Sequence, residues 1–206
     1  MKFPQVAADL SCRWCSAYLK IDVLDKVLVN TPDYQGRRIL VVTGERAAES
    51  PNRARYQVFE RGRVHAPKAG RHVDHWRPVH GWSEQAVWDI MRRHGIVPHA
   101  AYQHGWGRLS CITCIFGSAN QWATIRAMAP ERFERIAAYE RQFGRTIHRK
   151  KSVAQLADEG TPYAPSLSNP ALFAAAMDPE WSGVIKVPPE EWVLPAGAFG
   201  EAQGPS

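Results

Sequence analysis

The four cysteines of this 206-residue chain form two Cys-x-x-Cys pairs, Cys12 with Cys15 and Cys111 with Cys114. Two thiols at this spacing can close a redox disulfide, or supply half of a four-thiolate site for zinc or an iron–sulfur cluster. Residues 16 to 110 separate the pairs, so a shared site requires a folded domain that brings them together, unlike a local zinc finger. Because no cysteine is left over, we expect the pairs to share one metal site. Independent redox pairs and inert buried cysteines are the alternatives.

Basic side chains lie near both cysteine pairs and after an apolar run between them. Lys20 follows the first pair, Arg108 precedes the second, and Arg46 and Arg53 follow the run RILVV. Guanidinium groups bind phosphate and sulfate through two parallel hydrogen bonds, although most surface arginines are simply solvated. Arg46 is the strongest of these candidates, because it follows a predicted parallel strand, where α/β folds place their ligands.

The histidines are weaker candidates. His72 and His75 in RHVDHW have metal-binding side chains, but no further ligand of that kind lies nearby in sequence. Solvated loop histidines are therefore the simpler interpretation. His99 and His104 lie at either end of HAAYQH and are candidates for lining a pocket.

Apolar periodicity predicts the elements of the first half of the chain. Apolar residues at three- and four-residue steps predict a helix over 15–28. The β-branched run RILVVTGE predicts a buried strand over 38–43, and 57–72 alternates loosely like a short strand or an exposed loop. A short helix with Ser50 or Asn52 as its N-cap follows the first strand.

The second half of the chain reads as mainly helical. Helices are predicted over 83–94, beginning after Ser83 and ending at Gly95, and over 130–143. After about residue 151 the pattern weakens. Three tryptophans are expected in the core because aromatic side chains bury large areas, namely Trp76, Trp82 and Trp88.

Composition restricts the class of protein. The net charge of +6, from 26 Lys and Arg against 20 Asp and Glu, suits an anionic ligand such as a nucleotide or a nucleic-acid backbone. No apolar run is long enough to cross a bilayer, and MKFPQVAADLSC lacks the apolar stretch of a secretory signal. We therefore expect a cytoplasmic protein with no membrane partner, in a compartment where structural disulfides are disfavoured.

Three stretches together resemble the phosphoadenosine phosphosulfate (PAPS) reductase family. VVTGERAAESPNRARY resembles the segment in which a G-x-R-x-x-E-S pattern follows a central strand. The stretch from Trp76 to Cys114 resembles the family's signature, with R-P-V, a helix containing V-W, A-Y and the second cysteine pair. CRWCSAYLKI resembles the segment that carries the first cysteines of cluster-bearing members, followed by a lysine.

The resemblance implies an α/β fold. A partial adenine-nucleotide-hydrolase-like domain would cover residues 1–150, incomplete at its N-terminal side, and a helical, irregular extension would cover 151–206. The resemblance also implies that a [4Fe–4S] cluster, or zinc as the alternative, is held by Cys12, Cys15, Cys111 and Cys114. It implies that the anionic part of an adenine nucleotide or a sulfonucleotide faces Lys20, Arg46, Arg53 and Arg108.

Two departures from the family pattern shape the expected function. The family begins with a strand and an S-G-G-x-D-S-type phosphate loop, which this sequence lacks. We therefore expect a second polypeptide to supply this half, or the chain to be a divergent or truncated relative. The edge beside strand 38–43 should then be exposed or covered by a partner. Sulfonucleotide reductases also carry a nucleophilic cysteine in an E-C-G-[LI]-H-like tail, whereas this chain reads EAQGPS. A thiosulfonate mechanism lacks its nucleophile here.

Two functional hypotheses follow. The first is an iron–sulfur oxidoreductase or sulfurtransferase that acts in sulfonucleotide reduction or nucleotide-dependent sulfur transfer, as part of a complex, with no catalytic residue assigned. The second is a metal-stabilised binding module without catalysis, with nucleic acid as its partner. The Arg-rich loops permit the second hypothesis, but the basic residues are scattered and match no recognised nucleic-acid motif.

Overall fold

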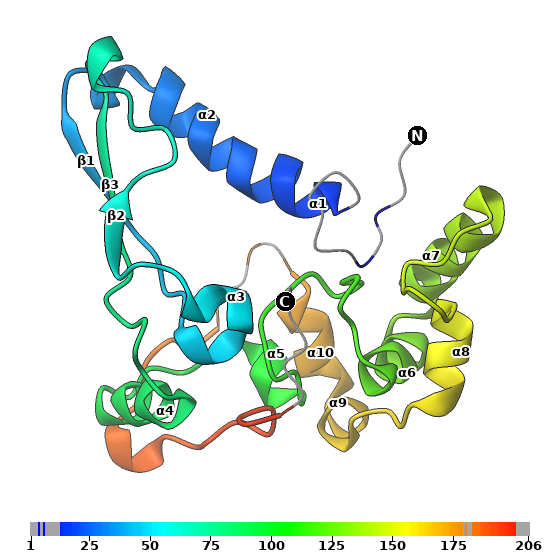
Figure 1. The fold of residues 1–206 in the computed structure, drawn as a ribbon. Coiled ribbons are helices and arrows are strands. Elements are labelled where there is room, and N and C mark those ends of the chain that lie inside the picture. Colours follow the sequence, from blue (N-terminus) through cyan, green and yellow to red (C-terminus); the bar gives the residue numbers. More distant parts are fainter. Residues whose placement is uncertain (1–3, 5, 7–12, 179, 181–182, 201–206) are drawn as a thin grey trace. The chain divides into compact units, whose positions relative to one another are not determined.

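The computed structural model describes residues 4, 6, 13–178, 180 and 183–200 (Figure 1). The chain divides into two compact units. The strand unit comprises the described residues from 13 to 83. The helical unit comprises those from 84 to 200, together with residues 4 and 6. Cys12 lies outside the described residues.

A helical stretch begins the strand unit and carries Cys15 and Lys20. The helix α1 (Trp14–Ser16), the π-helical η1 (Ala17–Ile21) and the helix α2 (Asp22–Asn30) follow one another without a break. The helix predicted over 15–28 is therefore confirmed. Arg63 lies in the loop between the second and third strands in sequence. Its guanidinium is 3.8 Å from the carboxylate of Asp22 and 3.0 Å from that of Asp25, both on α2. These two ion pairs connect the helix to the sheet.

A three-stranded sheet with the order β1-β3-β2 forms the rest of the strand unit. The strand β1 (Arg38–Val42) runs parallel to β3 (His72–Trp76), and β2 (Phe59–Arg61) runs antiparallel to β3. The parallel strand predicted over 38–43 is confirmed, but its predicted burial is wrong, because Leu40 and Val42 are 50% and 54% exposed. β2 confirms the strand interpretation within 57–72. Among the described strands β1 pairs only with β3, so it has the open edge that the sequence predicts.

One face of the sheet carries a row of exposed apolar side chains. Val42 of β1 lies opposite Trp76 of β3, which in turn lies opposite Phe59 of β2. The exposed fractions of these residues are 54%, 41% and 56%. The prediction that Trp76 belongs to the core is therefore wrong, because its position in β3 turns it to this face. On the opposite face Val73 is almost completely buried.

Short helical turns join the strands. They are η2 (Pro32–Tyr34), η3 (Ala47–Glu49), α3 (Pro51–Ala54) and η4 (Pro67–Ala69). Ser50 is the N-cap of α3, since its hydroxyl accepts a hydrogen bond from the backbone N–H of Arg53 at 3.2 Å. This side-chain bond satisfies one of the N–H groups that the first turn leaves unpaired.

The helical unit contains both of the predicted longer helices. The helix α4 (Glu84–Arg93) confirms the prediction over 83–94, and α7 (Pro130–Phe143) confirms that over 130–143. Gly95 and Gly144 follow these helices in the left-handed conformation, with φ of 63° and 59°. The remaining elements are α5 (Ala100–Gln103), α6 (Ala119–Met128), α8 (Val153–Glu159), α9 (Ala164–Ser168), α10 (Pro170–Ala176) and η5 (Pro189–Glu191).

The core of the helical unit lies where α6 packs against α7 and α8 (Figure 1). Trp122 and Ile125 of α6 are completely buried, and Phe133 of α7 and Val153 of α8 are buried as well. The rings of Trp122 and Phe133 pack against each other with their centroids 6.4 Å apart. Trp88 is buried as predicted, and Trp82, in the strand unit, is half-buried. The packing of α6 on α8 crosses residue 150, and the domain boundary placed there stays a prediction.

None of the helices in the described part of the chain combines the length and the apolar character needed to cross a bilayer.

Candidate functional site

The loops that follow β1 and β3 lie at the same edge of the sheet, because the two strands are parallel. Arg77, immediately after β3, connects them and is 5% exposed. Its guanidinium donates hydrogen bonds to Glu45 Oε2 at 2.6 Å and to the carbonyl of Gln57 at 2.8 Å. It also lies 2.8 Å from Glu60 Oε1. A buried arginine therefore fixes the loop after β1, which contains Glu45, against the other strands.

His75 extends this network across the sheet. The Arg77 guanidinium can only donate, so His75 Nδ1 accepts from it at 3.1 Å and the ring proton lies on Nε2. The Nε2–H group then donates to Thr43 Oγ1 at 2.8 Å, and the Thr43 hydroxyl donates to Glu45 Oε2 at 3.2 Å. Each donor in this chain of hydrogen bonds thus meets an acceptor.

The network keeps His75 uncharged. Burial first, and then the nearby Arg77 charge, lower the pKa of His75 from its ordinary 6.5, although the carboxylates of Glu45 and Glu60 oppose this shift. Protonation would put a second N–H group against the Arg77 guanidinium. His75 is therefore a neutral hydrogen-bonding residue on β3, not the solvated loop histidine predicted from the sequence.

Arg46 and Arg53 meet at one carboxylate beside this network. Glu49 lies 3.6 Å from Arg46 Nε and pairs closely with Arg53 Nη1. Arg46 also donates weakly to the carbonyl of Trp82 at 3.4 Å, in the loop after β3. The structure thus brings together two of the four basic residues predicted to bind an anion. We call the loop from Gly44 to Arg53 the arginine loop.

The other predicted residues lie on separate elements. Lys20 is exposed on η1 of the strand unit, and Arg108 is half-buried in the loop after α5 of the helical unit. Cys15 lies in α1, while Cys111 and Cys114 lie in the helical unit. The described cysteines are free thiols. Their convergence with Cys12 on one site stays a prediction.

The second cysteine pair brackets a turn. Ile112 and Thr113 form the turn. Cys111 before it is exposed, and Cys114, three positions later, is half-buried. A second turn follows, closed by a hydrogen bond of 2.9 Å from the N–H of Gly117 to the carbonyl of Cys114. A Cβ atom on Gly117 would approach Trp122 Nε1 to 2.8 Å, so this position requires glycine. The buried Trp122 thereby supports the turn that presents the thiols.

The thiols of this turn fit half of a thiolate metal site. Two free cysteines three positions apart across a turn provide the soft ligands that zinc and iron–sulfur clusters take. Within the described residues no three His, Cys, Asp or Glu side chains gather as metal ligands.

His99 and His104 both line a pocket in the helical unit, as predicted. His99 is the N-cap of α5, where its Nδ1 accepts from the backbone N–H of Ala101 at 3.1 Å. His104 is 1% exposed and packs edge-on against Phe173. Burial lowers the pKa of His104 from 6.5, and the backbone groups of Leu172 and Pro165 oppose this shift.

Comparison with known proteins finds a family and a relative for the chain. The model of the phosphoadenosine phosphosulfate reductase domain matches residues 6–116, which contain the arginine loop and both cysteine pairs. An uncharacterized 37.8 kDa protein encoded in the gpa 5' region of Escherichia phage 186 is 36% identical over 141 residues. The match covers 68% of this chain and 40% of that protein, so the chain spans less than half of the relative's length. No solved structure matches the chain significantly.

Proposed function

The chain belongs to the phosphoadenosine phosphosulfate reductase family, and from this premise we propose that it acts in sulfonucleotide reduction or in nucleotide-dependent sulfur transfer. Its ligand would be an adenine nucleotide or a sulfonucleotide. The observation that carries the proposal is the arginine loop at the carboxyl edge of β1, where Arg46 and Arg53 share Glu49. α/β folds bind their ligands at the carboxyl ends of parallel strands, and here β1 and β3 form the parallel pair.

The arginine loop suits a ligand with more than one negative charge. Glu49 pairs with both guanidinium groups, and it carries a single charge divided between them. A phosphate or sulfate group offers more acceptor oxygens and matches the fork of each guanidinium. Such a ligand would displace Glu49, while Arg77 and Glu45 keep the loop itself in position. Lys20 and Arg108 are proposed to complete the anion site.

We propose that Cys12, Cys15, Cys111 and Cys114 hold a [4Fe–4S] cluster, with zinc as the alternative. When bound, such a cluster would order the substrate pocket and supply redox or sulfur chemistry. The protein's own contribution is the turn at Cys111–Cys114, which Gly117 and Trp122 support. Anaerobic purification followed by iron, sulfide and zinc analysis would distinguish the two metals.

We further propose that a second polypeptide supplies the phosphate-loop half of the domain. Two features of the strand unit support this. β1 has an open edge among the described strands, and the adjoining face presents Val42, Trp76 and Phe59 to solvent. An added strand would satisfy the free backbone groups of β1 and extend the sheet beside Val42, and another element of the same partner would cover the apolar row. We expect Val42→Lys to abolish co-purification with a co-expressed S-G-G-x-D-S polypeptide. Val184→Lys, an exposed apolar residue of the helical unit, serves as the control.

Calorimetric titration with PAPS and with ATP tests the nucleotide proposal. The titration uses the anaerobically purified protein together with any such partner. We expect Arg46→Met and Arg53→Met each to weaken binding at least about tenfold, since a charge-assisted hydrogen bond contributes roughly 1.5–3 kcal/mol. Arg55→Met is the matched control, because Arg55 ends the same short helix and is exposed. If the complex binds neither nucleotide, the proposal loses its substrate.

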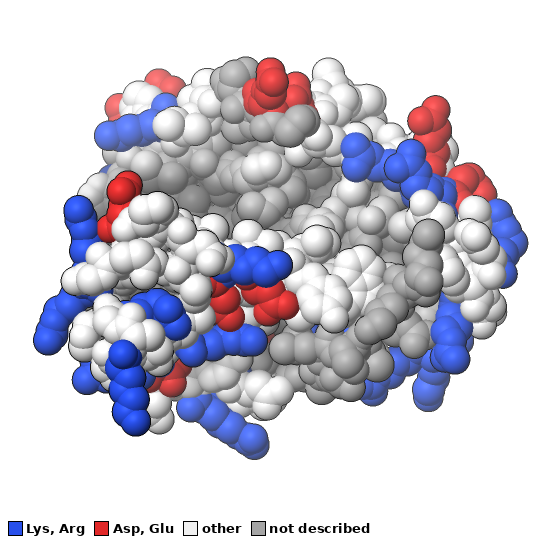
Figure 2. Space-filling model, turned by 90° about the horizontal axis from the view of Figure 1, so that it is seen from above, with Lys and Arg blue, Asp and Glu red and all other residues white. Residues whose placement is uncertain are grey.

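A basic segment of the helical unit favours the second candidate function, nucleic-acid binding. Residues 141–151 include Arg141, Arg145, Arg149, Lys150 and Lys151. Two of these pair with carboxylates in the described part of the chain, Arg141 with Glu134 and Lys151 with Glu159. Against this function, lysine and arginine side chains are spread among uncharged residues on the face drawn in Figure 2. DNA or RNA binding that weakens steeply with salt, with nucleotides ignored, would support the binding module instead.

A further inference from the structure

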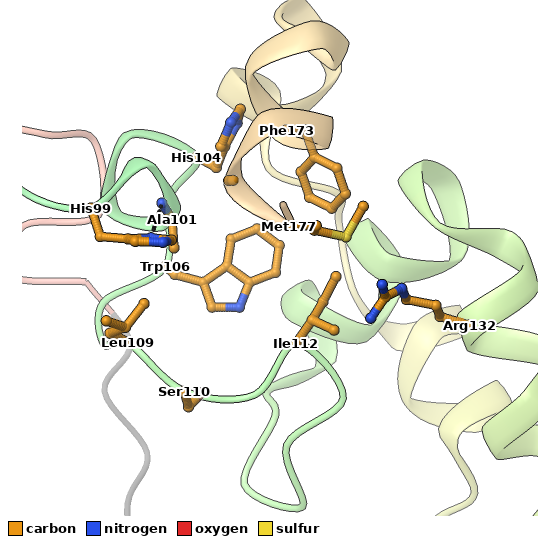
Figure 3. Close-up of a pocket in the computed structure, with 11 residues that line it drawn as sticks. His99, Ala101, His104, Trp106, Leu109, Ser110, Ile112, Arg132, Phe173 and Met177 are labelled. Atoms are coloured by element: carbon orange, nitrogen blue, oxygen red, sulfur yellow. Dashed lines mark hydrogen bonds between the residues drawn. The ribbon is translucent and has the colours of Figure 1, made fainter. Parts of the chain in front are cut away.

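A pocket of about 220 Å³ lies in the helical unit next to the second cysteine pair (Figure 3). Its walls come from the loop after α5, from α10 and from the first turn of α7. The lining includes the side chains of Trp106, Ile112, Phe173, Met177 and Arg132. The proposed nucleotide and metal functions do not use this pocket.

The aromatic wall of the pocket is held rigidly. Trp106 is 5% exposed and packs edge-on against Tyr163, with ring centroids 5.3 Å apart. It also contacts Phe173, which is 4% exposed, at a centroid distance of 6.1 Å. Ile112 and Met177 face these rings across the pocket (Figure 3). A fixed indole opposite an adaptable thioether and an aliphatic side chain suits a flat apolar group.

Arg132 adds a positive charge to a pocket whose other polar lining residues are His99, His104 and Ser110. Its guanidinium points toward Ile112 and the pocket interior (Figure 3). Among the described residues no carboxylate forms an ion pair with it. Arg132 lies in the first turn of α7, where the helix dipole is already positive, so its charge does not stabilise the helix. The guanidinium is thus available to a negatively charged ligand.

The size of the pocket restricts the ligand. At about 30 Å³ for each water, it holds the equivalent of roughly seven waters, below the range of about 300–1,000 Å³ usual for larger ligands. That space suits a one- or two-ring aromatic group and is too small for a whole nucleotide. We propose that the pocket binds a planar aromatic acid, with its rings on Trp106 and its carboxylate or sulfonate on Arg132.

Occupancy of the pocket would also affect the cysteine turn. Ser110 and Ile112 line the pocket and are the two neighbours of Cys111 in the chain. A ligand in contact with these residues restricts the backbone of the turn. Since Cys111 is exposed, its alkylation by iodoacetamide should slow when the pocket is filled.

Calorimetric titration of the full chain with 2-naphthoate tests the proposal. We expect saturable binding, and binding at least about fivefold weaker for 2-naphthamide, which has the same shape without the charge. Arg132→Met should weaken naphthoate binding by a similar factor. Arg135→Met, an exposed arginine on the same helix, should leave it unchanged. Iodoacetamide labelling of Cys111 in the metal-free wild-type chain, measured by mass spectrometry, should slow with 2-naphthoate.

A variant that fills the pocket provides an independent measurement. Ala176→Phe places a ring in the pocket and should abolish naphthoate binding, with Met177→Trp as the substitute if that variant does not fold. No binding of 2-naphthoate at millimolar concentration would overturn the proposal. It would also be overturned if 2-naphthamide bound equally well, or if the Arg132 and Arg135 variants behaved alike.

Discussion

Replacing Arg77 with methionine should destabilise the strand unit far more than replacing any exposed arginine. The substitution keeps most of the apolar stem but removes the guanidinium that meets Glu45, Glu60, His75 and the carbonyl of Gln57. Removing one partner of a buried ion pair costs about 3–5 kcal/mol, because the other charges stay behind without a partner. The Glu45 and Glu60 side chains are 31% and 41% exposed, so water recovers part of this loss. We therefore expect about 2–3 kcal/mol.

Urea unfolding followed by tryptophan fluorescence measures this change, and hydrogen exchange of the β3 amides assigns it to the strand unit. Arg61→Met is the matched control, because Arg61 pairs with Asp74 on the same sheet but its side chain is 69% exposed. The control should cost less than about 1 kcal/mol. Arg77→Lys should recover only part of the loss, since an ammonium group cannot reach all four acceptors at once. Equal effects of Arg77→Met and Arg61→Met would refute the assignment of Arg77 as the centre of the network.

Three further predictions concern pH, metal content and packing. Stability should fall as the pH drops below about 6.5, by up to about 1.4 kcal/mol per pH unit from His75, because the unfolded chain binds a proton that the folded network excludes. Urea unfolding at pH 5 to 8 checks this, and His75→Gln should make the profile shallower and leave the part that His104 contributes. Cys111→Ser should lower the iron or zinc content per chain measured after anaerobic purification, and an unchanged content would contradict the shared site. Gly117→Ala should lower the free energy of unfolding by about 1–3 kcal/mol, because the added Cβ atom clashes with Trp122. Gly81→Ala should have little effect in the same unfolding assay, because a Cβ atom there has no neighbour within 4 Å.

The elements that the sequence predicts correctly carry their own local signals. β1 is a run of branched apolar residues, and α4 and α7 combine an apolar stripe with a glycine that ends each helix. Ser50 is one of the two caps expected for α3, and the structure selects it. In these segments the local preference of the residues agrees with the element that forms. Each element can therefore be predicted without knowledge of distant residues.

The central strand β3 is the main element that sequence reasoning missed. Its sequence HVDHW breaks the polar–apolar alternation of a strand at Asp74 and His75, and histidine and aspartate are poor indicators of a strand. Its position is set by pairing with β1 and β2, and its polar side chains are satisfied by residues far away in sequence. Only the structure reveals that His75 and Arg77 meet Thr43 and Glu45.

The helices α6 and α8 were missed although their signals are local. Both begin with a capping box, Ser118 with Gln121 and Ser152 with Gln155, in which each side chain bonds to the backbone of the other residue. These S-x-x-Q patterns predict helix starts from the sequence alone. The apolar pattern of α6 does not help, because the helix is buried on most sides and has no polar face.

The strand unit depends on its polar network because it has little apolar core. Among its described residues only Leu28 and Val73 are buried apolar side chains, whereas the helical unit buries many more. Burying a large apolar side chain contributes about 1.5–3 kcal/mol, so two such residues cannot hold a sheet and a helical stretch together. The hydrogen bonds of Arg77 and the ion pairs of Arg63 provide connections within the unit that apolar packing does not. The same shortage explains why the exposed row of Val42, Trp76 and Phe59 suits a partner: covering it would supply the apolar burial that the strand unit lacks.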